Sequence, residues 1–261
     1  MSTPEPALAG RATTRTLWFP RQHGAWAMLG VPLLLGVAAT APSAWHLVLA
    51  VAAVAGYLAA ATAQAWLRAR RRPSFIPSLV TYGTVFAVAG VALLVAFPML
   101  ALAALVVVPA GALVVGGARP GTPRDLANSL GQTAIALVLV PAAALVSGAW
   151  ETDVVVRATL IAAGYLVGTV LVVRSVIRQR GNRGFAALSV GFHAALVVAA
   201  AATLAWPYAV YFAGLTGRAA ALPLVERRRA ATPRPLRPIH VGIVEIVAST
   251  VLVVLAFAVP I

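Results

Sequence analysis

The sequence predicts an all-α membrane protein, a bundle of about nine transmembrane helices. Of its 261 residues, 61% are hydrophobic and only 10% are charged, and the mean hydropathy of +0.94 is too high for a soluble domain of this length. Apolar stretches of about 17–25 residues, the length of helix that crosses the hydrocarbon core, recur along the chain. Basic residues gather at alternate breaks between these stretches, as cytoplasmic loops require.

The chain divides into a short tail and one long apolar domain. Residues 1–20 carry Arg11 and Arg15 among Ala, Thr and Pro and have no apolar core. We expect them to form a disordered basic tail, and residues 21–261 to form a single transmembrane helical domain. The nine spans are predicted at residues 25–41, 44–67, 76–97, 99–118, 125–148, 154–177, 185–205, 207–224 and 240–260. Pro98 and Pro207 mark two of the divisions, because merging either pair of spans would exceed one crossing.

The arginines predict the orientation of the bundle. All twenty basic residues are arginine, and eighteen of them precede the first span or lie at the ends of the even-numbered spans, the exceptions being Arg157 and Arg218. The groups are Arg11, Arg15 and Arg21; Arg68, Arg70, Arg71 and Arg72; Arg119 and Arg124; Arg174, Arg178, Arg180 and Arg183; and Arg227, Arg228, Arg229, Arg234 and Arg237. The positive-inside rule therefore places the N-terminus inside and the C-terminus outside. Membrane lipids, including anionic lipid at the cytoplasmic face, are the expected partners. Nucleic acid is not, because the charge lies at membrane borders.

Polar side chains enter the predicted spans mainly near their arginine-rich ends. Such groups are expected to face one another, because a charge held in hydrocarbon costs about 2.5–3.5 kcal/mol. Asp125, Asn128, Ser129 and Gln132 share one helical face, and Arg218 lies inside the eighth span. We expect a polar, arginine-lined cavity open to the cytoplasm. The candidate ligand-binding residues are Arg21, His23, Gln64, Arg124, Asp125, Asn128, Gln132, Arg174, Arg178, Asn182, His193 and Glu245.

Several of these residues also have a purely structural interpretation. His193 could form a hydrogen bond to Ser189 one turn earlier, and Glu245 could neutralise Arg174 or Arg178. Gly164 and Gly168 form a G-x-x-x-G pair, which predicts close packing of two helices. Cysteine is absent, which excludes disulfides and thiolate catalysis. The usual ATPase and hydrolase motifs and paired carboxylates are also absent from the sequence, and no cofactor or metal is predicted.

Three stretches resemble the YwiC-like family of bacterial membrane proteins. They are RQHGAWAM at 21–28, RDLANSLGQTAIAL at 124–137 and RSVIRQRGN at 174–182. The resemblance extends over roughly residues 18–260. It implies a multi-pass protein of the bacterial cytoplasmic (inner) membrane, in a family without an established activity.

The predicted arrangement is also similar to that of the UbiA-type prenyltransferases, which are nine-helix bundles with a central cavity. Those enzymes use aspartate-rich motifs at the inner ends of helices 2 and 6 to hold Mg²⁺ on a prenyl diphosphate. Here the corresponding stretches read QAWLRARRR at 64–72 and RSVIRQRGN at 174–182. Arginine thus stands where the resemblance would require aspartate. Arg174 and Arg178 could therefore bind the phosphorylated or carboxylated head group of an amphipathic, isoprenoid-like molecule directly, without a metal.

Three functions are compatible with the sequence. The first is binding of an anionic amphipathic small molecule, by a divergent UbiA-like transferase or by a non-catalytic binder. The second is transport of a small anion or metabolite, in which Glu245, Asp125 or His193 would relay protons. The third is a membrane scaffold whose inner arginines dock lipids or a partner protein.

Overall fold

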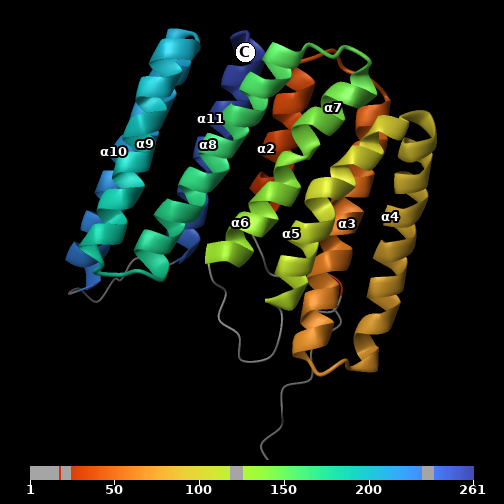
Figure 1. Ribbon diagram of the computed structural model, residues 1–261. Helices are drawn as coiled ribbons and strands as arrows, with labels where there is room; N and C mark the ends of the chain where they lie inside the picture. The colour runs from red at the N-terminus through yellow and green to blue at the C-terminus, as the bar shows by residue number, and fades with distance from the viewer. Residues whose placement is uncertain (1–17, 19–24, 118–125, 231–237) are drawn as a thin grey trace, which may run out of the picture.

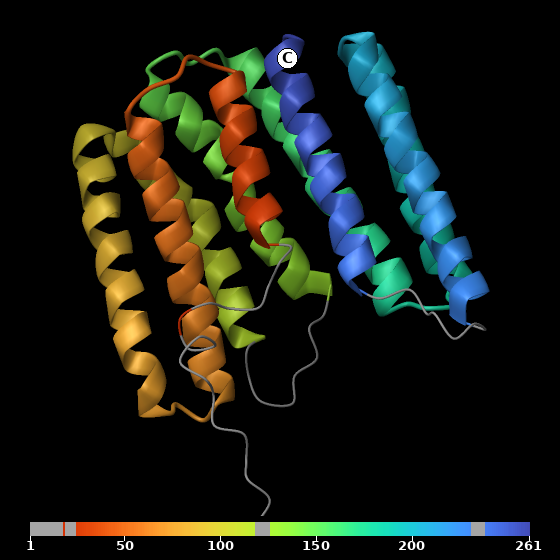
Figure 2. The same ribbon diagram turned by 180° about the vertical axis from the view of Figure 1, so that it is seen from behind.

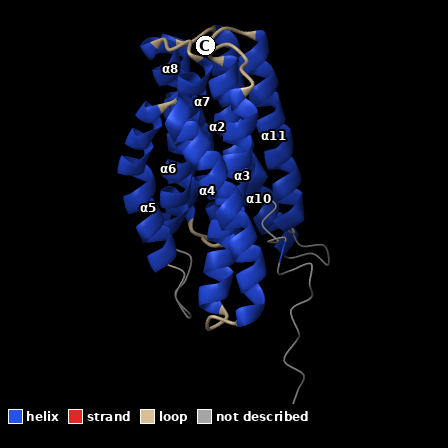
Figure 3. Cartoon of the chain, turned by 90° about the vertical axis from the view of Figure 1, so that its right-hand side faces the viewer, coloured by secondary structure: helices blue, strands red, loops and turns tan. Residues whose placement is uncertain are grey.

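The computed structural model describes Trp18 and residues 25–117, 126–230 and 238–261. Within these ranges the protein is helical and contains no strand (Figure 3). The α-helices are α2 (Ala25–Ala38), α3 (Trp45–Arg68), α4 (Ile76–Ala96), α5 (Ala104–Gly116), α6 (Leu126–Leu137), α7 (Leu139–Ser147), α8 (Thr152–Ile177), α9 (Arg183–Thr203), α10 (Trp206–Ala230) and α11 (Pro238–Ala258). Two 3₁₀ turns, Pro73–Phe75 and Pro98–Ala103, precede α4 and α5.

Each of the nine predicted spans coincides with a helical segment in the described ranges. Seven segments are long and apolar enough to cross a membrane, while α2 is shorter, with 14 residues, and α10 carries several charged residues. The fifth span consists of two helices, α6 and α7. Pro141 explains this division, because it has no N–H to donate to the carbonyl of Leu137, where α6 ends. The prediction of an all-α, multi-pass membrane protein is confirmed.

The helices form a bundle with a long hairpin at either side. The α9–α10 hairpin lies at one side and the α3–α4 hairpin at the other, with α8, α11 and α2 between them (Figures 1 and 2). The turn between α3 and α4, the turn between α8 and α9, and the C-terminal end of α10 all lie at the end of the bundle opposite the C-terminus. These three segments are rich in arginine, so we call this end the arginine-rich end. That it faces the cytoplasm stays a prediction.

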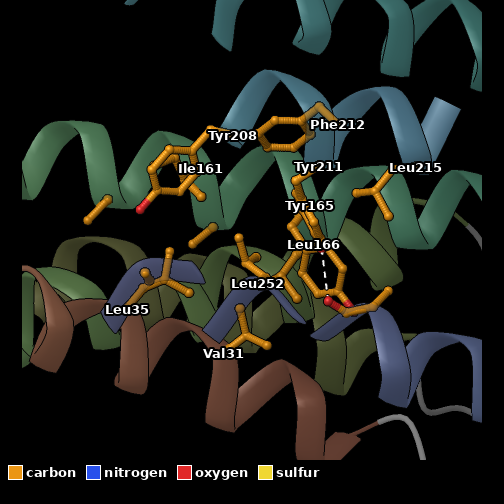
Figure 4. Packing of buried hydrophobic residues seen from close by; sticks show 14 of the residues in the cluster. Val31, Leu35, Ile161, Tyr165, Leu166, Tyr208, Tyr211, Phe212, Leu215 and Leu252 are labelled. Carbon is orange, nitrogen blue, oxygen red and sulfur yellow. Dashed lines mark hydrogen bonds between the residues drawn. The ribbon is translucent and has the colours of Figure 1, made fainter. Parts of the chain in front are cut away.

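The largest group of buried apolar residues joins α2, α8, α10 and α11. Val31 and Leu35 of α2 face Leu166 of α8 and Leu252 of α11, and Phe212 packs in from α10 (Figure 4). By contrast, α4 and α5 expose much of their apolar surface. Val95 of α4 and Leu105 of α5 are 78% and 75% exposed. Because the chain is a membrane protein, these faces contact lipid.

The G-x-x-x-G pair of α8 packs against α9, as predicted. A Cβ atom added at Gly164 would lie 2.9 Å from a methyl carbon of Leu196, and one added at Gly168 would lie 2.7 Å from Nε2 of His193. Neither position has room for a side chain unless its neighbour moves. The two glycines therefore let α8 and α9 approach closely.

Gly168→Ala should lower the free energy of unfolding by about 1–3 kcal/mol, because the added methyl group overpacks a buried contact. The measurement is a reversible unfolding titration in mixed micelles. Gly191→Ala on α9 is the control, since a Cβ there meets nothing within 4 Å. Equal stability of the two variants would contradict close packing at Gly168.

Candidate functional site

Eight of the twelve candidate residues lie in the described part of the chain. Arg21, His23, Arg124 and Asp125 lie outside it. Gln64 of α3 is buried, 8% exposed, and its side-chain oxygen accepts a hydrogen bond of 3.5 Å from Arg68. The structure thus places Gln64 close to an arginine of the same helix.

Asn128 and Gln132 of α6 interact with each other and with α5. The side-chain amide of Asn128 donates to the carbonyl oxygen of Val114 at 3.1 Å, and Gln132 donates to Asn128 Oδ1 at 2.9 Å. Asn128 is only 4% exposed. These contacts attach the polar face of α6 to α5.

Arg174, Arg178 and Asn182 surround the turn between α8 and α9. The backbone N–H groups of Arg178 and Gln179 both donate to the carbonyl oxygen of Arg174, at 2.9 and 2.7 Å. Gly181 then adopts a positive φ of 77°, and the side chain of Asn182 caps α9 by accepting from the N–H of Phe185 at 3.0 Å. The motif RSVIRQRGN is therefore a helix end, a turn and an N-cap. Head-group binding by Arg174 and Arg178 stays a prediction.

Glu245 of α11 is held by side chains from two other helices. Its Oε1 lies 2.6 Å from Nη1 of Arg218 on α10, and its Oε2 accepts a hydrogen bond of 2.9 Å from the hydroxyl of Thr169 on α8. The hydroxyl of Tyr165 donates to the backbone carbonyl of Glu245 at 3.2 Å. The side chains of Arg218 and Glu245 are 8% and 10% exposed. Glu245 thus neutralises an arginine, but its partner is Arg218 and not Arg174 or Arg178, because α10 packs beside α11 at this level.

His193 of α9 lies at the same junction and is fully buried. Its Nδ1 is 2.7 Å from the carbonyl oxygen of Ser189, so the expected bond within the helix forms through the backbone. A Cβ atom added at Gly168, the neighbour of Thr169 on α8, would lie 2.7 Å from Nε2 of His193. We call Tyr165, Thr169, Ser189, His193, Arg218 and Glu245 the polar junction.

Sequence reasoning found only part of the polar junction. Arg218 was visible as a lone arginine inside an apolar span, but its separation from Glu245 along the chain gave no sign that they pair. Thr169 gave no signal, because a threonine in a membrane helix commonly bonds to its own backbone. The tertiary packing of α8, α10 and α11 brings these residues together.

A second feature is a shallow hollow between α9 and α10 near the arginine-rich end, which we call the α9–α10 hollow. Its volume is about 240 Å³. It is lined by Arg183, Ala186, Ala187, Val190, Ala219, Ala220, Pro223, Leu224 and Arg227. None of the twelve predicted residues lines it. Sequence reasoning treated Arg183 and Arg227 as ordinary loop charges, and only the pairing of α9 with α10 places them at one opening.

The two guanidinium groups of the hollow have no hydrogen-bond or ion-pair partner among the described residues. Their neighbour Arg180 differs, because its Nε lies 3.4 Å from the carboxylate of Glu226. No described carboxylate therefore neutralises Arg183 or Arg227. The other lining residues are apolar, so the hollow combines a charged opening with a hydrocarbon-like floor.

Comparison with known proteins supports the family resemblance. The sequence model of the family described as YwiC-like protein matches residues 19–144. The uncharacterized protein YwiC of Bacillus subtilis (strain 168) is 28% identical over 180 residues, which cover 67% of this chain and 73% of the relative. No solved structure matches the chain significantly. The resemblance to the YwiC-like family is confirmed, whereas that to the UbiA-type prenyltransferases stays a prediction. Helices α8 to α11 lie beyond the residues that the family model matches.

Proposed function

We propose that this chain, a YwiC-like multi-pass protein of the bacterial cytoplasmic membrane, binds an anionic amphipathic lipid in the α9–α10 hollow. One observation carries the proposal: Arg183 and Arg227, whose guanidinium groups have no partner among the described residues, line an otherwise apolar hollow. An amphipathic anion has the complementary form, since its head group is charged and its chain is apolar.

The residues of the hollow suit each part of such a ligand. Guanidinium groups bind phosphate oxygens through charge-assisted, often bidentate hydrogen bonds, and basic pockets between transmembrane helices on the cytoplasmic side bind anionic head groups. Ala186, Ala187 and Ala220 have short side chains, which leave space for a hydrocarbon chain along the helices. The proposal keeps the ligand class expected from the sequence. It assigns the head group to Arg183 and Arg227 in place of Arg174 and Arg178.

Replacing both arginines, Arg183→Ala with Arg227→Ala, should weaken binding of phosphatidylglycerol by about ten- to thirtyfold, because each arginine near the surface contributes about 1 kcal/mol. The measurement is native mass spectrometry of the detergent-purified full chain, with phosphatidylcholine as the neutral lipid. Farnesyl diphosphate is the second probe, because it carries the isoprenoid chain that the sequence suggested.

Two further variants separate a specific site from general attraction. Arg70→Ala with Arg72→Ala removes the same charge from exposed residues at the same end of the bundle, and it should leave the affinity unchanged. Ala187→Phe should fill the hollow and exclude the lipid while leaving binding of glycerol phosphate intact. An equal loss in both double variants would contradict the proposed site, since the arginines would then act only through their summed charge.

A further inference from the structure

One edge of the buried Arg218 guanidinium has no partner. Nη1 lies 2.6 Å from the carboxylate of Glu245, but Nε and Nη2 are buried and make no hydrogen bond within the described part of the chain. The N–H of Nε and one N–H of Nη2 point in parallel from the same edge of the planar group. This edge matches two oxygens of a carboxylate or phosphate. The side chain is 8% exposed, so bulk water does not solvate it.

Two more polar atoms in the same region are buried and unpaired. They are Nε2 of His193 and Oγ of Ser189, and both residues are 0% exposed. Because Nδ1 of His193 lies 2.7 Å from the carbonyl oxygen of Ser189, which can only accept, Nδ1 carries the ring proton. Nε2 of the neutral ring, which packs against Gly168 of α8, is therefore an acceptor without a donor among the described residues. Buried donors and acceptors are nearly always paired in native proteins, and a bound polar group would satisfy these four atoms, which have no partner among the described residues.

We propose that the polar junction binds a small oxyanion together with one proton. The oxyanion, a carboxylate or a phosphate, would accept hydrogen bonds from Nε and Nη2 of Arg218, and Ser189 would donate to it. The proton would bind at Nε2 of His193. This site is separate from the α9–α10 hollow and involves neither Arg183 nor Arg227, so it goes beyond lipid binding.

Charge balance is the reason for the proton. Arg218 and Glu245 already neutralise each other, and an added anion would leave an uncompensated negative charge within the bundle, which is costly in a membrane. A proton on His193 restores neutrality. Because binding then requires both species, affinity falls as the pH rises through the range in which histidine loses its proton.

The other titratable groups at the junction do not supply that proton. The hydroxyl of Tyr165 on α8 donates to the carbonyl of Glu245, and that of Tyr211 on α10 donates to the carbonyl of Ala248. Both tyrosines therefore hold their protons as donors. Glu245 is held by Arg218 and Thr169 as an acceptor. Arg174 of α8 and His240 of α11 lie closer to the arginine-rich end of their helices. The neighbouring α2 has no charged or titratable residue.

The test is isothermal titration calorimetry on the purified full chain in nanodiscs, with inorganic phosphate and acetate as probes and chloride as the monatomic anion that cannot offer each donor a separate oxygen. Repeating the titration in buffers with different ionisation enthalpies counts the protons taken up. We expect binding of at least one probe with uptake of about one proton, and weaker binding at about pH 8 than at pH 5.5. Failure of both probes to bind at about 10 mM would overturn the site and leave water as its occupant.

Matched variants assign the roles. Arg218→Lys keeps a positive charge for Glu245 but removes the two parallel N–H groups, so oxyanion affinity should fall at least about tenfold. Arg72→Lys, at an exposed position, should change nothing. His193→Gln should abolish the proton uptake, and it tests the site even if Arg218→Lys fails to fold. Undiminished affinity in Arg218→Lys, or undiminished proton uptake in His193→Gln, would refute the assignment. Loss of lipid binding in the hollow would leave these results unaffected.

Discussion

Glu245→Leu should lower the free energy of unfolding by about 3–5 kcal/mol, because it leaves the buried charge of Arg218 without its partner. The two side chains are 8% and 10% exposed and their charged atoms are 2.6 Å apart. The substitution also removes the acceptor of the hydroxyl of Thr169 on α8. Because Glu245 connects α10 and α8 to α11, the lost stability should come from a weaker attachment of the α9–α10 hairpin to the rest of the bundle. Reversible unfolding in mixed micelles measures the effect.

A double variant distinguishes the pair from the packing around it. Arg218→Met with Glu245→Leu removes both charges and keeps apolar volume, and it should recover most of the stability lost in Glu245→Leu. Glu226→Leu is the control, because Glu226 pairs at 3.4 Å with Arg180, whose side chain is 50% exposed. Glu226→Leu should lower the free energy of unfolding by less than about 1 kcal/mol. A double variant no more stable than Glu245→Leu would show that the charge of Arg218 is not the cause.

The sequence predicts the helices well because membrane solvation acts locally. An apolar stretch of bilayer length must satisfy its backbone hydrogen bonds within itself, so it forms a helix whatever its neighbours are. Prolines then fix the ends, as at Pro98 and Pro207, where the predicted divisions are observed. The effect of Pro141 is not visible at this level: the span predicted at 125–148 is one membrane-length segment, Leu126–Ser147, but the proline divides it into α6 and α7.

The candidate site was less predictable because it depends on which helices are neighbours. Faces rich in Ala, Val and Leu are chemically alike, so the sequence did not indicate that α9 pairs with α10 or that Arg218 meets Glu245. His46 illustrates the same point at the opposite end of the bundle. Its Nε2 lies 3.0 Å from the carbonyl oxygen of Ala143 on α7, and its Nδ1 accepts from the N–H of Ser43. This buried contact between α3 and α7 gave no signal in the sequence.

Adding a single methyl group where α2 packs against α7 should lower the free energy of unfolding about as much as removing a charge from the polar junction does. A Cβ atom added at Gly36 would lie 2.6 Å from Cβ of Ala143 and 2.8 Å from the backbone oxygen of Val140. The end of a flexible side chain could move aside, but a backbone carbonyl moves only if α7 moves with it. Gly36→Ala should therefore cost about 3 kcal/mol, at the upper end of the range for overpacking.

Gly30→Ala provides a control on the same helix. A Cβ there meets nothing within 4 Å, so the variant should be neutral or up to about 1 kcal/mol more stable, because alanine favours the helix over glycine. Adding Ala143→Gly to Gly36→Ala removes one of the two contacts and should restore part of the stability. The contact with Val140 remains, so the rescue should be incomplete. If Gly36→Ala and Gly30→Ala unfold alike, α2 can shift along α7, and the core that Leu35 of α2 forms with α8 and α11 does not depend on close approach to α7.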